Sequence, residues 1–419
     1  RVLFRSAAAM TNLLVFPSAL IPLLPMLAAL AALGCATLAR RAHARNSEPQ
    51  PWLDAGLVAL TLLPLAVVLA WPAMLTPTRA ALAAGLSVAL LAHDPRDLPQ
   101  TEVALKILWV LLAAFALSWA GDALLALASG SARAREQWPA LALALDPYSL
   151  WSAALSLSLL AGLVMLGGAP FHFWPGDLFH GARAHLAPFV AATLQLAGAA
   201  WLLRHLDGID AFPGAAQLVR SLLTLAAAVA LAGGAATLGY QSRPERRVGA
   251  LVGLQGGLVL ASLAAAPMRT PFESHGGLAA WFAHLLLATT GASLLSRFLP
   301  VSAEPAERAS VLFRRHPWSG VAGCYALLSL AGAPGTPGMH IWLDVARTLA
   351  DHRHPGLLFG VALAWLAAFG VAANEIRRAF GAPDGSPPPS RAVPRSLRAA
   401  MWLAAGALVV LLWAWAGGR

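Results

Sequence analysis

A few ionisable side chains stand within long apolar stretches of this sequence, where they could carry a proton or another ion. Asp122 lies deep in one such stretch, and Lys106, the only lysine of the chain, lies near the start of the same stretch. His340, Asp344 and Arg347 lie together in another. Because a charge at the centre of a bilayer costs about 2.5–3.5 kcal/mol on insertion scales, an ionisable residue there is a candidate for function.

Each of these candidates also has a structural interpretation. Asp122 could handle protons, or its carboxyl group could be hydrogen-bonded inside a helix bundle. Asp344 and Arg347 are three residues apart and share a helical face, which favours a local ion pair over a carrier role. His340 could titrate near neutral pH, or it could cap or pack against a helix end.

The composition indicates that lipid surrounds most of this chain. Of its 419 residues, 58% are apolar and 11% are charged, whereas a soluble domain carries about 25% charged residues. The net charge of +10 comes from arginines in short connections, which membrane topology explains better than nucleic-acid binding. Cys35 and Cys324 both lie in apolar runs, so we expect no disulfide framework. We also find no nucleotide-binding loop, metal cluster or nucleophilic triad, and expect no cofactor, metal site or catalytic centre.

The length of the apolar runs predicts an all-α polytopic membrane protein with about twelve transmembrane helices. The expected spans are 13–38, 53–72, 80–93, 104–128, 149–182, 187–205, 215–239, 248–267, 278–298, 318–350, 355–376 and 397–417. Arginines gather in alternate connections, which predicts that those connections are cytoplasmic and that both termini lie outside. Because Met10 is a plausible start, we expect that residues 1–9 are not native.

Two of the predicted spans, 149–182 and 318–350, are too long for one crossing and are interrupted by similar motifs. Leu-x-Gly-Ala-Pro followed by His-x-Trp and an Asp occurs in both. Glycine weakens a helix and proline removes a backbone donor, so each span should form two half-helices around an unwound middle. Paired broken helices that cross in opposite directions are typical of the inverted repeats of transporters. The break motifs contain Gly168, Pro170, His172, Trp174, Gly332 and Pro334.

The first break motif resembles a signature of subunit N of bacterial NADH:quinone oxidoreductase, or complex I. Residues 170–174 and 177–182 are similar to that family's Pro-Phe-His-x-Trp and Asp-Val-Tyr-x-Gly-Ala. Residues 329–338 look like its second broken helix, and residues 241–257 look like the start of its second repeat. Subunits L and M and the Mrp-type cation antiporters carry related versions. The resemblance covers residues 104–350.

The resemblance also shows where this sequence departs from the family. Family members are thought to move protons through buried lysines, one of them paired with a glutamate, because burial and a nearby carboxylate can tune the pKa of a lysine. The three lysine positions correspond to Met165, Gln195 and Trp342, and the glutamate position corresponds approximately to Asp122. The short spacing from Asp122 to Met165 implies that one helix of the first repeat is missing.

Three parts are therefore predicted. Residues 1–103 form N-terminal transmembrane helices, residues 104–350 form the antiporter-like inverted-repeat core, and residues 351–419 form C-terminal transmembrane helices with a proline-rich cytoplasmic linker. The resemblance implies a non-redox membrane-arm subunit in the bacterial inner (plasma) membrane. Its partners would be other membrane subunits of a complex I-like assembly and the lipid bilayer, and not nucleic acid.

The leading hypothesis for function is a divergent, shortened subunit related to the proton-translocating ones, with its own proton conduction impaired. One alternative is a purely structural descendant that packs between neighbouring subunits. Another is a cation/proton antiporter or a membrane-bound hydrogenase subunit.

Overall fold

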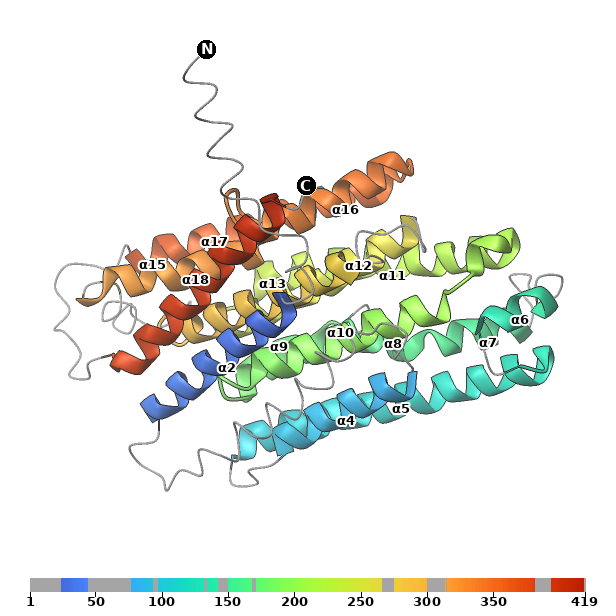
Figure 1. The fold of residues 1–419 in the computed structure, drawn as a ribbon, viewed down its shortest axis with the longest axis horizontal. Coiled ribbons are helices and arrows are strands. Elements are labelled where there is room, and N and C mark those ends of the chain that lie inside the picture. The colour runs from blue at the N-terminus through green and yellow to red at the C-terminus, as the bar shows by residue number, and fades with distance from the viewer. Residues whose placement is uncertain are drawn as a thin grey trace, which may run out of the picture.

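The computed structural model describes residues 24–43, 77–92, 97–131, 134–141, 150–167, 171–265, 275–299, 313, 315–380 and 393–417. Within these ranges every regular element is a helix. The helices lie side by side, with their axes roughly along the longest dimension of the molecule (Figure 1). The all-α prediction is thus confirmed for the described part of the chain, while the predicted span 53–72 lies outside it.

Seven helices of the described residues are long and apolar enough to cross a membrane. They belong to α5 (Leu98–Ser129), α10 (Ala187–His205), α11 (Pro213–Tyr240), α12 (Pro244–Ala265), α13 (His275–Ser296), α17 (Pro355–Phe380) and α18 (Arg395–Gly417). The chain is therefore a multi-pass membrane protein. The total of about twelve crossings stays a prediction.

The remaining described helices are not among these seven, and several are parts of the two interrupted spans. They are α2 (Leu24–His43), α4 (Pro77–Ala92), α6 (Ala134–Leu141), α7 (Leu150–Ser158), α8 (Leu160–Met165), α9 (Phe173–Gly181), η4 (Ile209–Ala211), α15 (Pro317–Leu330) and α16 (Pro337–Asp351). The first interrupted span divides between α8 and α9, and the second divides between α15 and α16, as the two motifs predict.

A left-handed glycine marks the end of each first half-helix. Gly167 has φ of 71° and Gly332 has φ of 75°, a conformation that other residues rarely adopt. Gly332 is one of the predicted break residues, and Pro334 lies in the exposed turn just after it. The predicted break residues Gly168 and Pro170 lie outside the described residues.

Helices α12 and α13 form the centre of the bundle, since their most apolar windows are 100% buried, against 28–44% for α5, α11, α17 and α18. Small residues let α12 approach the breaks closely. A Cβ atom on Gly256 would collide with the carbonyl oxygen of Leu166, at the end of α8. Gly338 of α16 meets the carbonyl of Ser329 in the same way.

Candidate functional site

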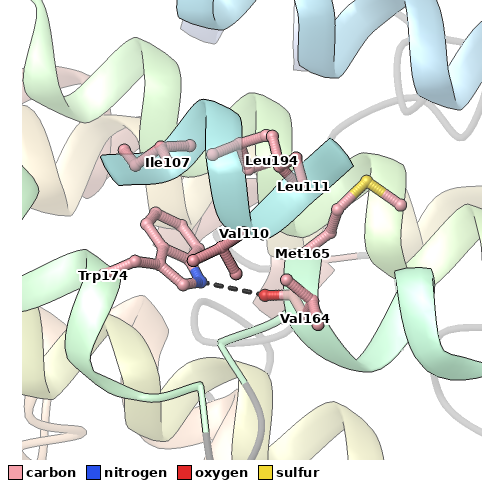
Figure 2. A pocket seen from close by; sticks show the side chains of 7 residues that line it. All are labelled: Ile107, Val110, Leu111, Val164, Met165, Trp174 and Leu194. Carbon is pink, nitrogen blue, oxygen red and sulfur yellow. Dashed lines mark hydrogen bonds between the residues drawn. The ribbon is translucent and has the colours of Figure 1, made fainter. Parts of the chain in front are cut away.

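At the first break, the side chain of Met165 lies in apolar surroundings. It lines a small pocket with Ile107, Val110, Leu111, Val164, Trp174 and Leu194 (Figure 2). The pocket's volume is about 10 Å³, at the lower limit for one water molecule, which also needs two to four polar partners. The indole Nε1 of Trp174 donates to the carbonyl of Val164 at 2.9 Å. We therefore expect the surroundings of Met165 to be dry.

Gln195, at the second predicted lysine position, is fully buried on α10. Its Nε2 donates to the carbonyl of Leu166 at 3.1 Å and to that of Val252 at 2.7 Å. The neutral amide thus joins the end of α8 to α12.

At the second break, two stacked tryptophans fill the space beside the turn. Trp342, the third predicted lysine position, is fully buried. Its ring lies parallel to that of Trp365, with centroids 5.7 Å apart and an interplanar angle of 16°. The Nε1 of Trp365 donates to the carbonyl of Gly332 at 2.9 Å. The Trp342 ring thus packs beside the turn, and its buried Nε1 has no hydrogen-bond partner among the described residues.

Two further polar side chains contact the end of α15. The Nε2 of Gln255, on α12, donates to the carbonyl of Leu330 at 3.0 Å. His284, in the middle of α13, is fully buried, and its Nε2 lies 3.2 Å from the carbonyl oxygen and 3.1 Å from the Oγ of Ser329. Like the first break, the second is surrounded by donors to backbone carbonyls.

The predicted group on α16 lies beyond this break. Asp344 Oδ1 is 3.5 Å from Arg347 Nη1, and the Arg347 side chain is 63% exposed. His340 is half-buried one turn earlier on the same helix. Asp344 and Arg347 therefore form a local ion pair on α16.

Asp122 contacts a histidine that the sequence analysis did not single out. His205 Nε2 lies 3.2 Å and 3.3 Å from the two carboxylate oxygens of Asp122. The other ring nitrogen, Nδ1, lies 2.9 Å from the carbonyl oxygen of Trp201. Because a carbonyl oxygen can only accept, Nδ1 must carry a hydrogen. Nε2 then faces the carboxylate of Asp122, so the two side chains form a polar contact between α10 and α5.

Lys106 lies far from this pair, near the other end of α5. Its Nζ is 2.7 Å from Glu102 Oε1 and 3.8 Å from Asp177 Oδ2. Lys106 and Asp122 are sixteen positions apart, which corresponds to about 24 Å along the helix. On the buried face of α5 between them, Ser118 is the one polar residue among the described positions, and its Oγ is bonded to the backbone of Leu157. The structure does not bring these two predicted residues together.

A buried ion pair between α12 and α17 was also missed. Arg247 Nη1 contacts Glu375 Oε1, and the two side chains are 12% and 3% exposed. The preceding residue, Arg246, pairs with Asp177 of α9 at 3.3 Å. Glu375 is the only acidic residue of α17, and His284 stands inside a predicted span. Glu375 and His284 could therefore have been found from the sequence, because each is an ionisable residue within an apolar stretch.

The other two predicted break residues, His172 and Trp174, lie in contacts with neighbouring helices or with the end of α8. His172 precedes the first residue of α9, and its ring lies against Gly233 of α11. Trp174 holds the end of α8 through the Val164 carbonyl. Among the hydrogen bonds of the described residues, neither side chain has an ionisable partner.

Comparison with known proteins identifies distant relatives. No protein-family model matches the chain. NADH-quinone oxidoreductase subunit N 1 of Solidesulfovibrio magneticus is 29% identical over 293 residues, which cover 68% of this chain and 57% of that protein. The chain spans about half the length of the curated relatives that it matches.

Two solved assemblies contain chains with this fold. One is respiratory complex I from Thermus thermophilus, with a TM-score of 0.67, 22% identity, and coverage of 93% of this chain and 83% of that chain. The other is the Mrp complex from Dietzia sp., with a TM-score of 0.67, 16% identity, and coverage of 90% and 69%. The chain is thus a distant homologue of NADH-quinone oxidoreductase subunit N, as its motifs predict, and it has the fold of complex I and Mrp membrane subunits.

Proposed function

We propose that this chain is a membrane-arm subunit of a complex I-like assembly in the bacterial plasma membrane. The homology to subunit N and the shared fold support this assignment. In this proposal the two divided spans are the broken helices of an inverted repeat, within about twelve crossings. Lipid and neighbouring membrane subunits would cover the outer helices, and electron transfer would take place on other subunits.

We propose further that the chain does not conduct protons by itself. The observation that carries this proposal is the state of the three positions at which the family resemblance places lysines. Met165 lies among apolar side chains, Gln195 is bonded to two backbone carbonyls, and Trp342 is stacked on Trp365. A proton path needs groups that gain and lose protons within reach of one another, and none of these three side chains does so.

A subunit with residual conduction is the second candidate, and the pair of Asp122 and His205 favours it. Because a carboxylate and an imidazole are side chains of the kind that exchange protons, their contact would supply one step of a path. Replacing Asp122 with Asn in the whole assembly tests the idea. Unchanged proton pumping is expected if the pair is structural, whereas a pumping defect with normal assembly would favour a role in the path.

The identity of the assembly is tested by purifying the tagged chain from its native membrane and identifying the proteins that accompany it. We expect a quinone-site subunit together with subunits of the L and M type. Mrp-type antiporter partners would favour the antiporter alternative, and hydrogenase subunits would favour a hydrogenase-associated one. Recovery of the chain alone, under conditions in which a known complex I stays intact, would contradict the proposal.

A further inference from the structure

The two break motifs leave the same backbone group without its helical partner. In an α-helix, the carbonyl of residue i accepts a hydrogen bond from the N–H of residue i+4. Pro170 stands four residues after Leu166, and Pro334 stands four residues after Leu330. Because proline has no N–H, neither leucine carbonyl can be satisfied in this way. A backbone carbonyl that is buried without a donor is costly inside a membrane.

A glutamine from a neighbouring helix supplies the donor in both places. Gln195 Nε2 reaches the Leu166 carbonyl at 3.1 Å, and Gln255 Nε2 reaches the Leu330 carbonyl at 3.0 Å. Both glutamine side chains are fully buried. The orientation of each amide is set by chemistry, because the opposite orientation would place Oε1 against a carbonyl oxygen.

Helix α12 brings these two contacts together. Gln255 faces the second break, and the adjacent Gly256 lies against the Leu166 carbonyl at the first. Gln195 also donates to the carbonyl of Val252, one turn earlier on α12. The two breaks are therefore held on either side of one turn of a central helix.

We propose that Gln195 and Gln255 are a matched pair of positioning residues, which stabilise the two broken helices by replacing the N–H groups that Pro170 and Pro334 lack. The role of Gln195 is then structural at a position where the family resemblance implies a lysine. This inference holds whether or not the chain conducts protons, because it concerns the stability of the breaks.

Thermal unfolding of the purified full chain in detergent tests the proposal. Methionine has nearly the length of glutamine but no donor, so Gln195→Met and Gln255→Met should each lower the melting midpoint by at least about 2–4 °C. Gln217, which is exposed on α11, gives the matched control, and Gln217→Met should leave the midpoint unchanged. Midpoints of both buried variants equal to that of the wild type would overturn the proposal.

A second variant distinguishes a lost donor from altered packing. A protonated glutamic acid side chain can donate a hydrogen bond, whereas a methionine side chain cannot. At pH 4 the melting midpoint of Gln195→Glu should therefore lie above that of Gln195→Met and close to that of the wild type. A Gln195→Glu midpoint at pH 4 no higher than that of Gln195→Met would indicate packing alone and would contradict the role as a donor. Neither outcome depends on which assembly contains the chain.

Discussion

The two helix breaks and the end of the bundle that carries the first turn of α12, here called the arginine-bearing end, differ in their polar contacts. At the two breaks, neutral donors such as Gln195, Gln255 and Trp365 bind backbone carbonyls. At the end of the bundle that includes the first turn of α12, ion pairs prevail, with Arg246 on Asp177 and Arg247 on Glu375. A charge costs most at the bilayer centre, so neutral donors suit a helix break inside a membrane better than charged ones do.

Removing the acidic partner of the buried pair should have the largest effect. Glu375→Ala leaves Arg247 without its carboxylate in a buried site, which costs about 3–5 kcal/mol. Asp177→Ala is the comparison, because the contacts of Asp177 with Arg246 and Lys106 are more exposed and such pairs are worth about 0–1 kcal/mol each. The free energy of unfolding of each purified variant, compared with that of the wild type, measures the two losses. Equal losses for the two variants would remove the distinction between the buried and the exposed arginine.

Placing a charge in the middle of the bundle should be the next most damaging change. Met165→Lys restores the residue that the family resemblance implies, but its surroundings are apolar. A lysine near the bilayer centre costs about 2.5–3.5 kcal/mol, so we expect a less stable chain that still does not conduct. Met165→Leu serves as the control for the change of shape. Proton flux through the lysine variant in vesicles, with normal stability, would show that the path needs only this residue.

The tryptophan donors at the two breaks should contribute similar, smaller amounts. Trp365→Phe and Trp174→Phe each remove an Nε1–H donor and keep an aromatic ring, leaving the Gly332 or Val164 carbonyl with one donor fewer. Losing one such hydrogen bond costs about 0.5–1.5 kcal/mol. Unfolding measurements on the two variants compare the breaks directly. A loss at only one break would show that the two are not equivalent in this respect.

The smallest effect should come from a histidine at the arginine-bearing end. Arg398 Nη1 lies 2.9 Å from His316 Nδ1, so Nδ1 accepts. Burial, with Arg398 and Arg315 nearby, lowers the pKa of His316 below its usual value. The folded state therefore disfavours protonation, and the stability from this contact is lost as the pH falls below about 6.5. The melting midpoint of His316→Gln should depend less on pH over that range. An identical pH profile would exclude this contribution.

The divided spans and the family resemblance followed from the sequence because local rules govern them. A glycine and a proline at fixed spacing interrupt a helix wherever it packs. The partners of the buried polar groups did not follow, since they depend on how distant segments pack. Gln195 binds the carbonyl of Val252, 57 residues away, and Asp122 contacts His205, 83 residues away. A hydrogen bond to a backbone carbonyl also leaves no trace in the sequence, because every residue carries that group.

The central proposal is that this chain does not pass protons by itself. Reconstituting the isolated chain in vesicles, imposing a pH gradient and following its decay tests this claim most directly. We expect decay no faster than in protein-free vesicles, and no change on Asp122→Asn. Rapid decay that disappears in Asp122→Asn would contradict the account, since it would demonstrate a working path through the pair of Asp122 and His205.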